Sequence, residues 1–184
     1  MAAELLPQPS CLKTVPWHRD LSQVLQDILK NPLTRAIFIY PTKALAADQY
    51  RAIAPYLEYF GENRIVAGVY DGDTPVAERT RIRQSANIIL TNPEMVNGAF
   101  LPNHSKYGFD FIFSNLKYIV IDELHTYRGA FGSHLANAFP QTFACMPVLS
   151  FQSAVFVQFG NDRQILWKLA TEICGKQFEL VDKD

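Results

Sequence analysis

Two adjacent carboxylates, Asp122 and Glu123, directly follow an apolar run at residues 118–121, and His125 comes two positions later. Acids at the end of a buried strand place negative charge at the carboxyl edge of a sheet, where open α/β folds bind ligands. One carboxylate can hold Mg²⁺ on the phosphates of a nucleotide while a second group orients the attacking water. The pattern therefore indicates a metal-nucleotide site, and a solvated strand end is the alternative.

The elements that must position these residues alternate between strands and helices. Such alternation predicts an α/β fold with a parallel sheet, right-handed crossovers and helices on both faces. Residues 98–115 hold four phenylalanines without clear periodicity, which predicts a loop or a short helix there. Its aromatic side chains can form an exposed surface that stacks bases or meets a partner domain, or they can pack in the core, which is the more usual fate of phenylalanine. The expected strands are 35–40, 65–70, 87–90, 116–121 and one within 148–159, and the expected helices are 21–29, 45–60, 75–84, 129–139 and about 162–173.

Parallel strands bring their carboxyl ends to one edge of the sheet, so the residues that follow each strand should lie near one another. Threonine, lysine, asparagine and the acids dominate these positions. Taken singly, each cluster is also compatible with an ordinary turn or helix start. The clusters are Pro41-Thr42-Lys43, Tyr70-Asp71-Gly72-Asp73, Thr91-Asn92-Pro93, Asp122-Glu123-Leu124-His125 and Gln152-Ser153-Ala154-Val155.

The composition is that of a globular protein, with 48% hydrophobic and 12% aromatic residues in 184. We expect an irregular segment at 1–20 and one domain at 21–184. The net charge of -1 gives no basic surface, so any contact with nucleic acid must be local. Three widely spaced cysteines favour reduced thiols in the cytoplasm without a zinc site, and no apolar run is long enough to span a membrane.

Four motifs in this order resemble the first RecA-like domain of the superfamily 2 DExH/DEAD-box helicases. Within that superfamily the chain is most similar to the DNA-repair helicases related to mitomycin repair factor A. Four motifs at plausible spacings are far more specific than any one of them. They are Pro41 to Gln49, Tyr70 to Pro75 with Glu78-Arg79 and Ile82-Arg83, Ile89 to Met95, and Asp122 to Gly129.

The resemblance implies ATP hydrolysis coupled to strand translocation, with ATP and Mg²⁺ as cofactors and DNA, in preference to RNA, as partner. It implies that Asp122 holds Mg²⁺ through water, that Glu123 handles the hydrolytic water and that His125 couples the nucleotide site to the nucleic acid. Threonine hydroxyls, helix-terminal N–H groups and lysine can hold phosphates without reading bases. The positions implied for such backbone contacts are Thr42, Lys43, Gly72, Asp73, Thr91, Asn92 and Pro93.

The chain departs from the family pattern at the phosphate loop. Such helicases carry G-x-x-x-x-G-K-[ST], but the first sixty residues contain no glycine, and Lys13-Thr14 is the nearest remnant. Ser153 stands where the family has its Ser-Ala-Thr motif, although Val155 replaces the threonine and a core-strand serine is the alternative. The arginine of a second RecA-like domain is also absent from these 184 residues.

Three hypotheses follow. In the first, the chain is a motor-domain piece of an ATP-dependent DNA helicase, with a P-loop NTPase-type fold incomplete at its N-terminus and little turnover on its own. In the second, it is a helicase-like binding module that has lost nucleotide binding. An unrelated doubly wound hydrolase or transferase would need G-x-S-x-G or G-x-G-x-x-G, and neither occurs.

Overall fold

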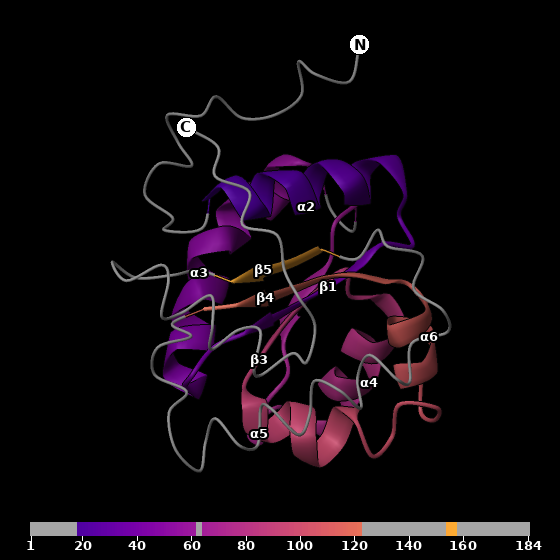
Figure 1. Ribbon diagram of the computed structural model, residues 1–184. Helices are drawn as coiled ribbons and strands as arrows, with labels where there is room; N and C mark the ends of the chain where they lie inside the picture. Colours follow the sequence, from indigo (N-terminus) through magenta and orange to yellow (C-terminus); the bar gives the residue numbers. More distant parts are fainter. Residues whose placement is uncertain (1–17, 62–63, 123–153, 158–184) are drawn as a thin grey trace.

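The computed structural model describes residues 18–61, 64–122 and 154–157. Five parallel strands form one sheet in these ranges, in the order β2-β3-β1-β4-β5 (Figure 1). The predicted parallel α/β fold is confirmed, including a strand within 148–159. The strands are β1 (Arg35–Ile39), β2 (Ala67–Val69), β3 (Ile88–Thr91), β4 (Leu116–Ile121) and β5 (Ala154–Val157).

Helices cover both faces of the sheet, as predicted. Figure 1 shows α2 and α3 on one side and α4, α5 and α6 on the other. The first helix begins at His18, three residues before the expected boundary, and α3 continues through Pro55 before Gly61 (φ +96°) ends it. The helices are α2 (His18–Lys30), α3 (Lys43–Tyr59), α4 (Val76–Ser85), α5 (Pro93–Met95), the π-helix η1 (Val96–Phe100) and α6 (Phe109–Ser114).

The core lies on both sides of β1, and for this reason all five residues of that strand are buried. On one side, apolar residues of α2 and α3 pack in one cluster with alternate strand residues such as Phe38 and Leu90. On the other side, Ile82 of α4 is fully buried and approaches Gly68 so closely that a Cβ there would lie 2.7 Å from its Cγ1. Glycine at position 68 thus lets α4 pack directly on β2.

Most of the aromatic side chains between β3 and β4 pack in the core, the second of the two uses expected for them, while Tyr107 and Phe111 are exposed. Phe100, Phe109 and Phe113 are buried, and the ring centroids of Phe100 and Phe109 are 5.0 Å apart. Phe100 also lies 5.0 Å from Tyr70 in an edge-to-face arrangement. In η1 the Leu101 N–H donates to the Val96 carbonyl at 3.0 Å, which closes a wider turn than that of an α-helix.

Polar side chains at the amino edge, where the strands begin, are bonded to one another. Asn87 is buried; its Nδ2 donates to the Pro32 carbonyl at 2.8 Å and its Oδ1 accepts from the Val66 N–H at 3.1 Å. Asp27 is buried as well, and it accepts from Lys117 at 2.6 Å and from the Tyr118 hydroxyl.

The environment of Asp27 changes two pKa values. Burial by itself would raise the pKa of Asp27, but the hydrogen bonds from Lys117 and Tyr118 and the charges of Lys117 and Lys30 outweigh it, and the pKa is lowered. Burial, with the hydrogen bond to Asp27, raises the pKa of Tyr118. The network therefore favours a charged aspartate beside a neutral phenol.

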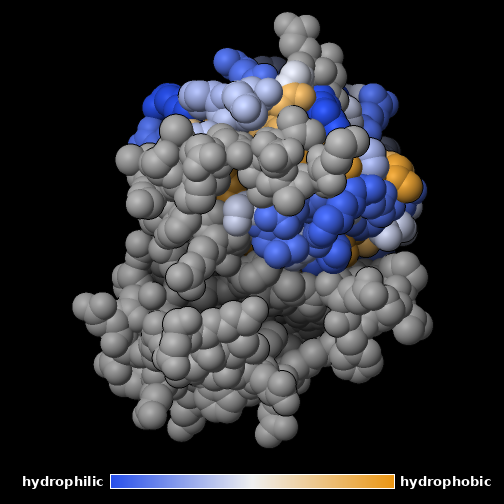
Figure 2. All heavy atoms as spheres, turned by 90° about the horizontal axis from the view of Figure 1, so that it is seen from above, coloured by the Kyte–Doolittle hydropathy of each residue, from blue (hydrophilic) through white to orange (hydrophobic). Residues whose placement is uncertain are grey.

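The described surface carries only scattered apolar residues. The hydropathy-coloured surface in Figure 2 is mainly hydrophilic, with separate small hydrophobic spots. None of the helices in the described ranges is long and apolar enough to cross a bilayer. The exposed large apolar side chains are Leu33, Tyr59, Val76, Tyr107 and Phe111.

Candidate nucleic-acid interface

The carboxyl edge of the sheet brings together the clusters that follow β1, β2, β3 and β4. Ile39 of β1 is in register with Thr91 of β3 and with Ile121 of β4, and Val69 of β2 is in register with Leu90. The residues that come next in each strand therefore leave the sheet at nearly the same level. The residues implied for nucleic-acid contact lie at the carboxyl ends of β1, β2 and β3. Asp122 lies at the end of β4, which is next to β1 on the side away from β3.

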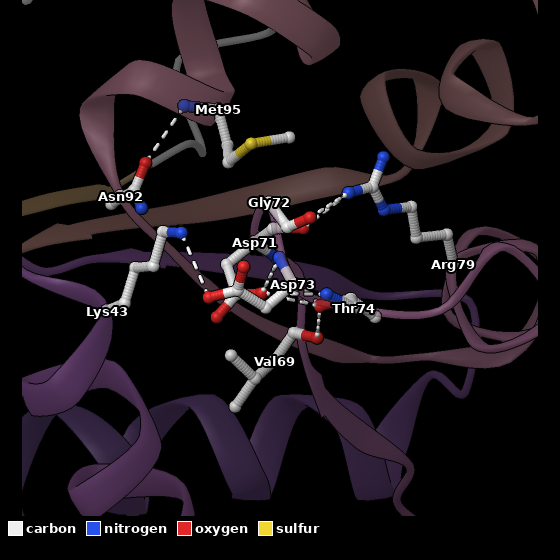
Figure 3. Close-up of polar contacts among 9 residues, drawn as sticks. All are labelled: Lys43, Val69, Asp71, Gly72, Asp73, Thr74, Arg79, Asn92 and Met95. Carbon is white, nitrogen blue, oxygen red and sulfur yellow. Dashed lines mark hydrogen bonds and ion pairs between the residues drawn. The ribbon is translucent and has the colours of Figure 1, made fainter.

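Thr42 and Lys43 form the start of α3. Thr42 is extended (φ −134°, ψ 153°), and its Oγ1 accepts a hydrogen bond from the Leu45 N–H at 3.2 Å, so it is the N-cap of the helix. This cap fixes Lys43 in the first helical turn. The Lys43 side chain is 44% exposed and extends over the end of β2 (Figure 3).

A compact turn at residues 71–74, the 71–74 turn, follows β2. Asp71 Oδ1 accepts from the N–H groups of Asp73 and Thr74, each at 2.9 Å, and the Asp71 N–H donates to Thr74 Oγ1 at 2.9 Å. Thr74 Oγ1 in turn donates to the Val69 carbonyl at 3.0 Å (Figure 3). The Asp71 carboxylate is thus engaged within the turn, whereas the Gly72 N–H has no partner among the described residues.

Lys43 and Asp73 connect the start of α3 with this turn. Lys43 Nζ lies 3.0 Å from Asp73 Oδ2, and both side chains are exposed (Figure 3). The hydrogen bond to Asp73 raises the pKa of Lys43, and the charges of Asp73, Asp71 and Glu94 act in the same direction. A Cβ at Gly72 would lie only 3.3 Å from Lys43 Nζ, so the ammonium group is directly beside the Gly72 main chain.

Thr91, the last residue of β3, and Asn92, which follows it, have buried side chains. Thr91 is fully buried, and its Oγ1 donates to the Tyr70 carbonyl at 2.7 Å. Asn92 is buried too; its Oδ1 accepts from the Met95 N–H at 2.9 Å, and Pro93 takes the first position of α5. In this arrangement the Thr91 side chain holds the chain just after β2, and the Asn92 side chain caps the start of α5.

Asp122 occupies the position expected for a carboxylate at the carboxyl edge. Asp122 is 7% exposed. Its N–H donates to the Ile39 carbonyl at 3.0 Å, which continues the hydrogen bonding between β1 and β4 by one residue. The described ranges contain no group of three or more His, Cys, Asp or Glu residues placed to hold a metal ion. Five other predicted site residues lie outside the described residues: Glu123, His125, Lys13, Thr14 and Ser153.

The structure adds Arg79 to this site, which the sequence did not single out as a functional residue. Its Nη2 donates to the carbonyls of Asp71 and Gly72 at 2.8 and 2.9 Å, and its guanidinium lies 5.5 Å from the centroid of the Tyr70 ring. Two features of the sequence could have indicated a role for Arg79. It belongs to the Glu78-Arg79 part of the second motif, and it lies near the start of α4, the helix that follows the 71–74 turn.

Comparison with known proteins decides the family. The profile of the DEAD/DEAH box helicases matches residues 13–158. The chain belongs to the DEAD/DEAH box helicase family. Its parallel sheet with helices on both faces is the RecA-like helicase fold that was predicted, and the clusters after β1, β2, β3 and β4 lie on one edge of this helicase-family sheet.

Individual relatives support the assignment of this helicase-family chain. An uncharacterized ATP-dependent helicase of Bacillus subtilis (strain 168), YprA, is 41% identical over 165 residues, which are 86% of this chain and 21% of the relative. The crystal structure of the DUF1998 helicase MrfA bound to DNA matches with a TM-score of 0.81 at 36% identity, over 95% of this chain and 22% of that one. MrfA bound to DNA and AMPPNP gives a TM-score of 0.74 at 37% identity, over 87% and 22% of the two chains. The chain spans about a fifth of the length of these relatives.

Proposed function

We propose that this chain supplies the DNA-contacting edge and the magnesium-directed carboxylate of a helicase motor domain, in which ATP hydrolysis drives movement along a DNA strand. One observation carries the proposal. The exposed ammonium of Lys43 and the Gly72 main chain lie side by side, although they come from the ends of different strands.

A phosphate group suits this pair of donors. An ammonium and a main-chain N–H can both donate to phosphate oxygens, and neither reads the identity of a base. Asp73 now holds Lys43 at 3.0 Å, and a phosphate would replace this exposed carboxylate. The contact would be local, in agreement with the net charge of -1.

DNA is the proposed nucleic acid because MrfA, which is 36% identical, has been crystallised with DNA. The implied contacts at Lys43 and Gly72 involve only the strand backbone, so the preference for DNA over RNA rests on this relative. For that reason, binding of an RNA of the same sequence should be measured beside that of the DNA.

Asp122 is the residue proposed to face the magnesium nucleotide. A carboxylate is a preferred oxygen ligand of Mg²⁺, which usually keeps several waters, and a ligand role through water fits a single acid at the end of β4. YprA is described as ATP-dependent, and MrfA has been crystallised with AMPPNP. We propose that Glu123 acts on the hydrolytic water and that His125 couples the two sites. Lys13, Thr14 and Ser153 remain candidates for nucleotide binding and coupling.

The first test measures binding of fluorescein-labelled single-stranded DNA to the 184-residue chain by anisotropy over a series of salt concentrations. Lys43→Gln is expected to weaken binding about threefold to tenfold and to reduce the salt slope by about 0.7, the loss of one phosphate contact on a single strand. Lys30→Gln removes the same charge at the amino edge and should change neither quantity. Equal losses in both variants, or an RNA of the same sequence binding more tightly, would contradict the proposal.

A second test separates the motor-domain proposal from a binding module without nucleotide. Magnesium-ATP is titrated into the chain with and without single-stranded DNA, and phosphate release is measured. Slow release that Asp122→Asn abolishes supports the motor domain. DNA binding with no saturable response to magnesium-ATP would instead support the binding module, whose basis is the lack of glycine before Gly61.

A further inference from the structure

We infer that Arg79 is a positioning residue: its guanidinium fixes the 71–74 turn so that the Gly72 N–H and the Lys43 ammonium can reach the same phosphate, and it does not itself touch the nucleic acid. The inference rests on the proposed function of the Lys43 and Gly72 donors, and it adds the residue that holds them in place.

The hydrogen bonds of Arg79 determine which way the turn faces. One nitrogen, Nη2, donates to two successive carbonyls, those of Asp71 at 2.8 Å and Gly72 at 2.9 Å. In a planar trans peptide the N–H points opposite to the carbonyl. The Gly72 N–H is therefore directed away from Arg79, and the Asp73 N–H is directed toward Asp71 Oδ1, where its hydrogen bond is observed.

Arg79 is itself held by the core. Its guanidinium lies over the ring of Tyr70, which is only 3% exposed, and its Nε is buried. The carbonyl of Tyr70 accepts from the buried Thr91 hydroxyl at 2.7 Å. The turn is thus fixed through Arg79 and Tyr70 to β3, and Figure 3 shows Arg79 reaching the Gly72 carbonyl.

Two other arginines of α4 make different contacts and serve as controls. Arg83 Nη1 donates to the Tyr70 hydroxyl at 3.0 Å and its guanidinium lies over Phe109. Arg83 thus supports the same ring, and within the described residues it makes no hydrogen bond to the 71–74 turn. Arg81 lies at the surface and pairs with Glu78 at 2.6 Å. Arg83 thus tests for loss of packing around Tyr70, and Arg81 tests for loss of charge alone.

The decisive measurement is DNA affinity as a function of salt for the 184-residue chain. Arg79→Gln is expected to weaken binding of single-stranded DNA about threefold to tenfold with the salt slope unchanged, because no phosphate contact is lost. Arg79→Lys should lose a similar amount, since an ammonium lacks the planar fork. A slope reduced by about 0.7, as expected for Lys43→Gln, or an equal loss in Arg81→Gln, would overturn the inference.

Amide hydrogen exchange tests the inference without DNA. Arg79→Gln is expected to speed exchange at the Asp73 and Thr74 amides roughly tenfold, while Arg81→Gln and Arg83→Gln leave them unchanged. Unchanged protection in Arg79→Gln would overturn the positioning role. If the wild-type chain fails to bind DNA, the proposed function fails, but the exchange result still decides whether Arg79 holds the turn. Circular dichroism establishes that each variant is folded.

Discussion

The two edges of the sheet use polar residues in opposite ways. At the amino edge, Asn87 and Asp27 are buried and their polar atoms bond to neighbouring chain segments. At the carboxyl edge, the side chains of Lys43 and Asp73 are exposed, and they form an ion pair between the start of α3 and the 71–74 turn. A buried hydrogen bond contributes to stability because water cannot replace it when one partner is removed. An exposed ion pair contributes little, and its groups remain available to ligands. We therefore expect the polar residues of the amino edge to contribute mainly to stability and those of the carboxyl edge mainly to binding.

Thr91 combines features of the two edges of the sheet. It lies at the carboxyl edge but is buried like the residues of the amino edge, and its hydroxyl supports the chain that carries the exposed donors. Substitutions should accordingly lose stability in the order Asn87, Asp27, Thr91, Asp73, while effects on DNA binding appear only in the last two.

The largest effect is expected for Asn87→Ala. The substitution removes the bonds from the buried Asn87 amide to the Pro32 and Thr34 carbonyls and leaves the half-buried Val66 N–H without its side-chain acceptor, which should lower the free energy of unfolding by about 3 kcal/mol. Urea denaturation measures the change. Asn103→Ala, which removes one partly exposed bond to the Ala99 carbonyl, should cost far less, and equal costs would remove the contrast.

Asp27→Asn should lower the free energy of unfolding by about 2 kcal/mol at neutral pH, the value of its charge-assisted bonds. The pKa of Asp27 is lowered on folding, so its contribution is present above the unfolded pKa of about 3.9 and is lost as the pH falls through the folded value. Urea denaturation at several pH values should show the difference between variant and wild type shrinking in acid. Asp48→Asn, at an exposed pair with Arg51, is the control and should show little difference at any pH.

Thr91→Val keeps the shape of the side chain and removes the hydrogen bond to the Tyr70 carbonyl. The expected cost is about 1 kcal/mol of unfolding free energy, with DNA affinity about threefold lower because the turn loses support. Denaturation and anisotropy measure the two effects. Thr80→Val, whose hydroxyl bonds within its own helix, should leave DNA affinity unchanged. A tighter complex for Thr91→Val would contradict the supporting role.

Asp73→Asn should be the mildest change and the only one that improves binding. The exposed ion pair contributes too little for its loss to be measurable by denaturation. DNA affinity should rise about twofold, because a negative charge is removed beside the phosphate and Lys43 is released. Asp110→Asn removes one charge on α6 and should have no effect, so an equal gain there would point to net charge alone.

Much of the fold was predictable because a sheet buried on both faces needs continuous apolar runs, and those runs are visible in the sequence. The predicted strand at 116–121 has the same bounds as β4. For the aromatic segment the sequence left both an exposed surface and core packing open, because residues without periodicity do not indicate which rings face inward. The structure buries Phe100 and Phe109 and exposes Tyr107.

The site was predictable only as far as parallel strands bring clusters to one edge. The bond between Lys43 and Asp73 joins residues 30 positions apart, and it depends on side-chain geometry that no local pattern encodes. For the same reason the sequence did not indicate that the Thr91 hydroxyl turns inward to Tyr70 or that Arg79 reaches back to the turn.

The π-helix η1 has an evolutionary consequence. Its Val96-to-Leu101 bond encloses one residue more than an α-helical turn, and Gly98 within it has open space around its Cα. We expect deletion of Gly98 to close this turn to an α-helical one with Phe100 still against Tyr70. Relatives that are one residue shorter at this point are therefore expected to keep the aromatic contacts that follow.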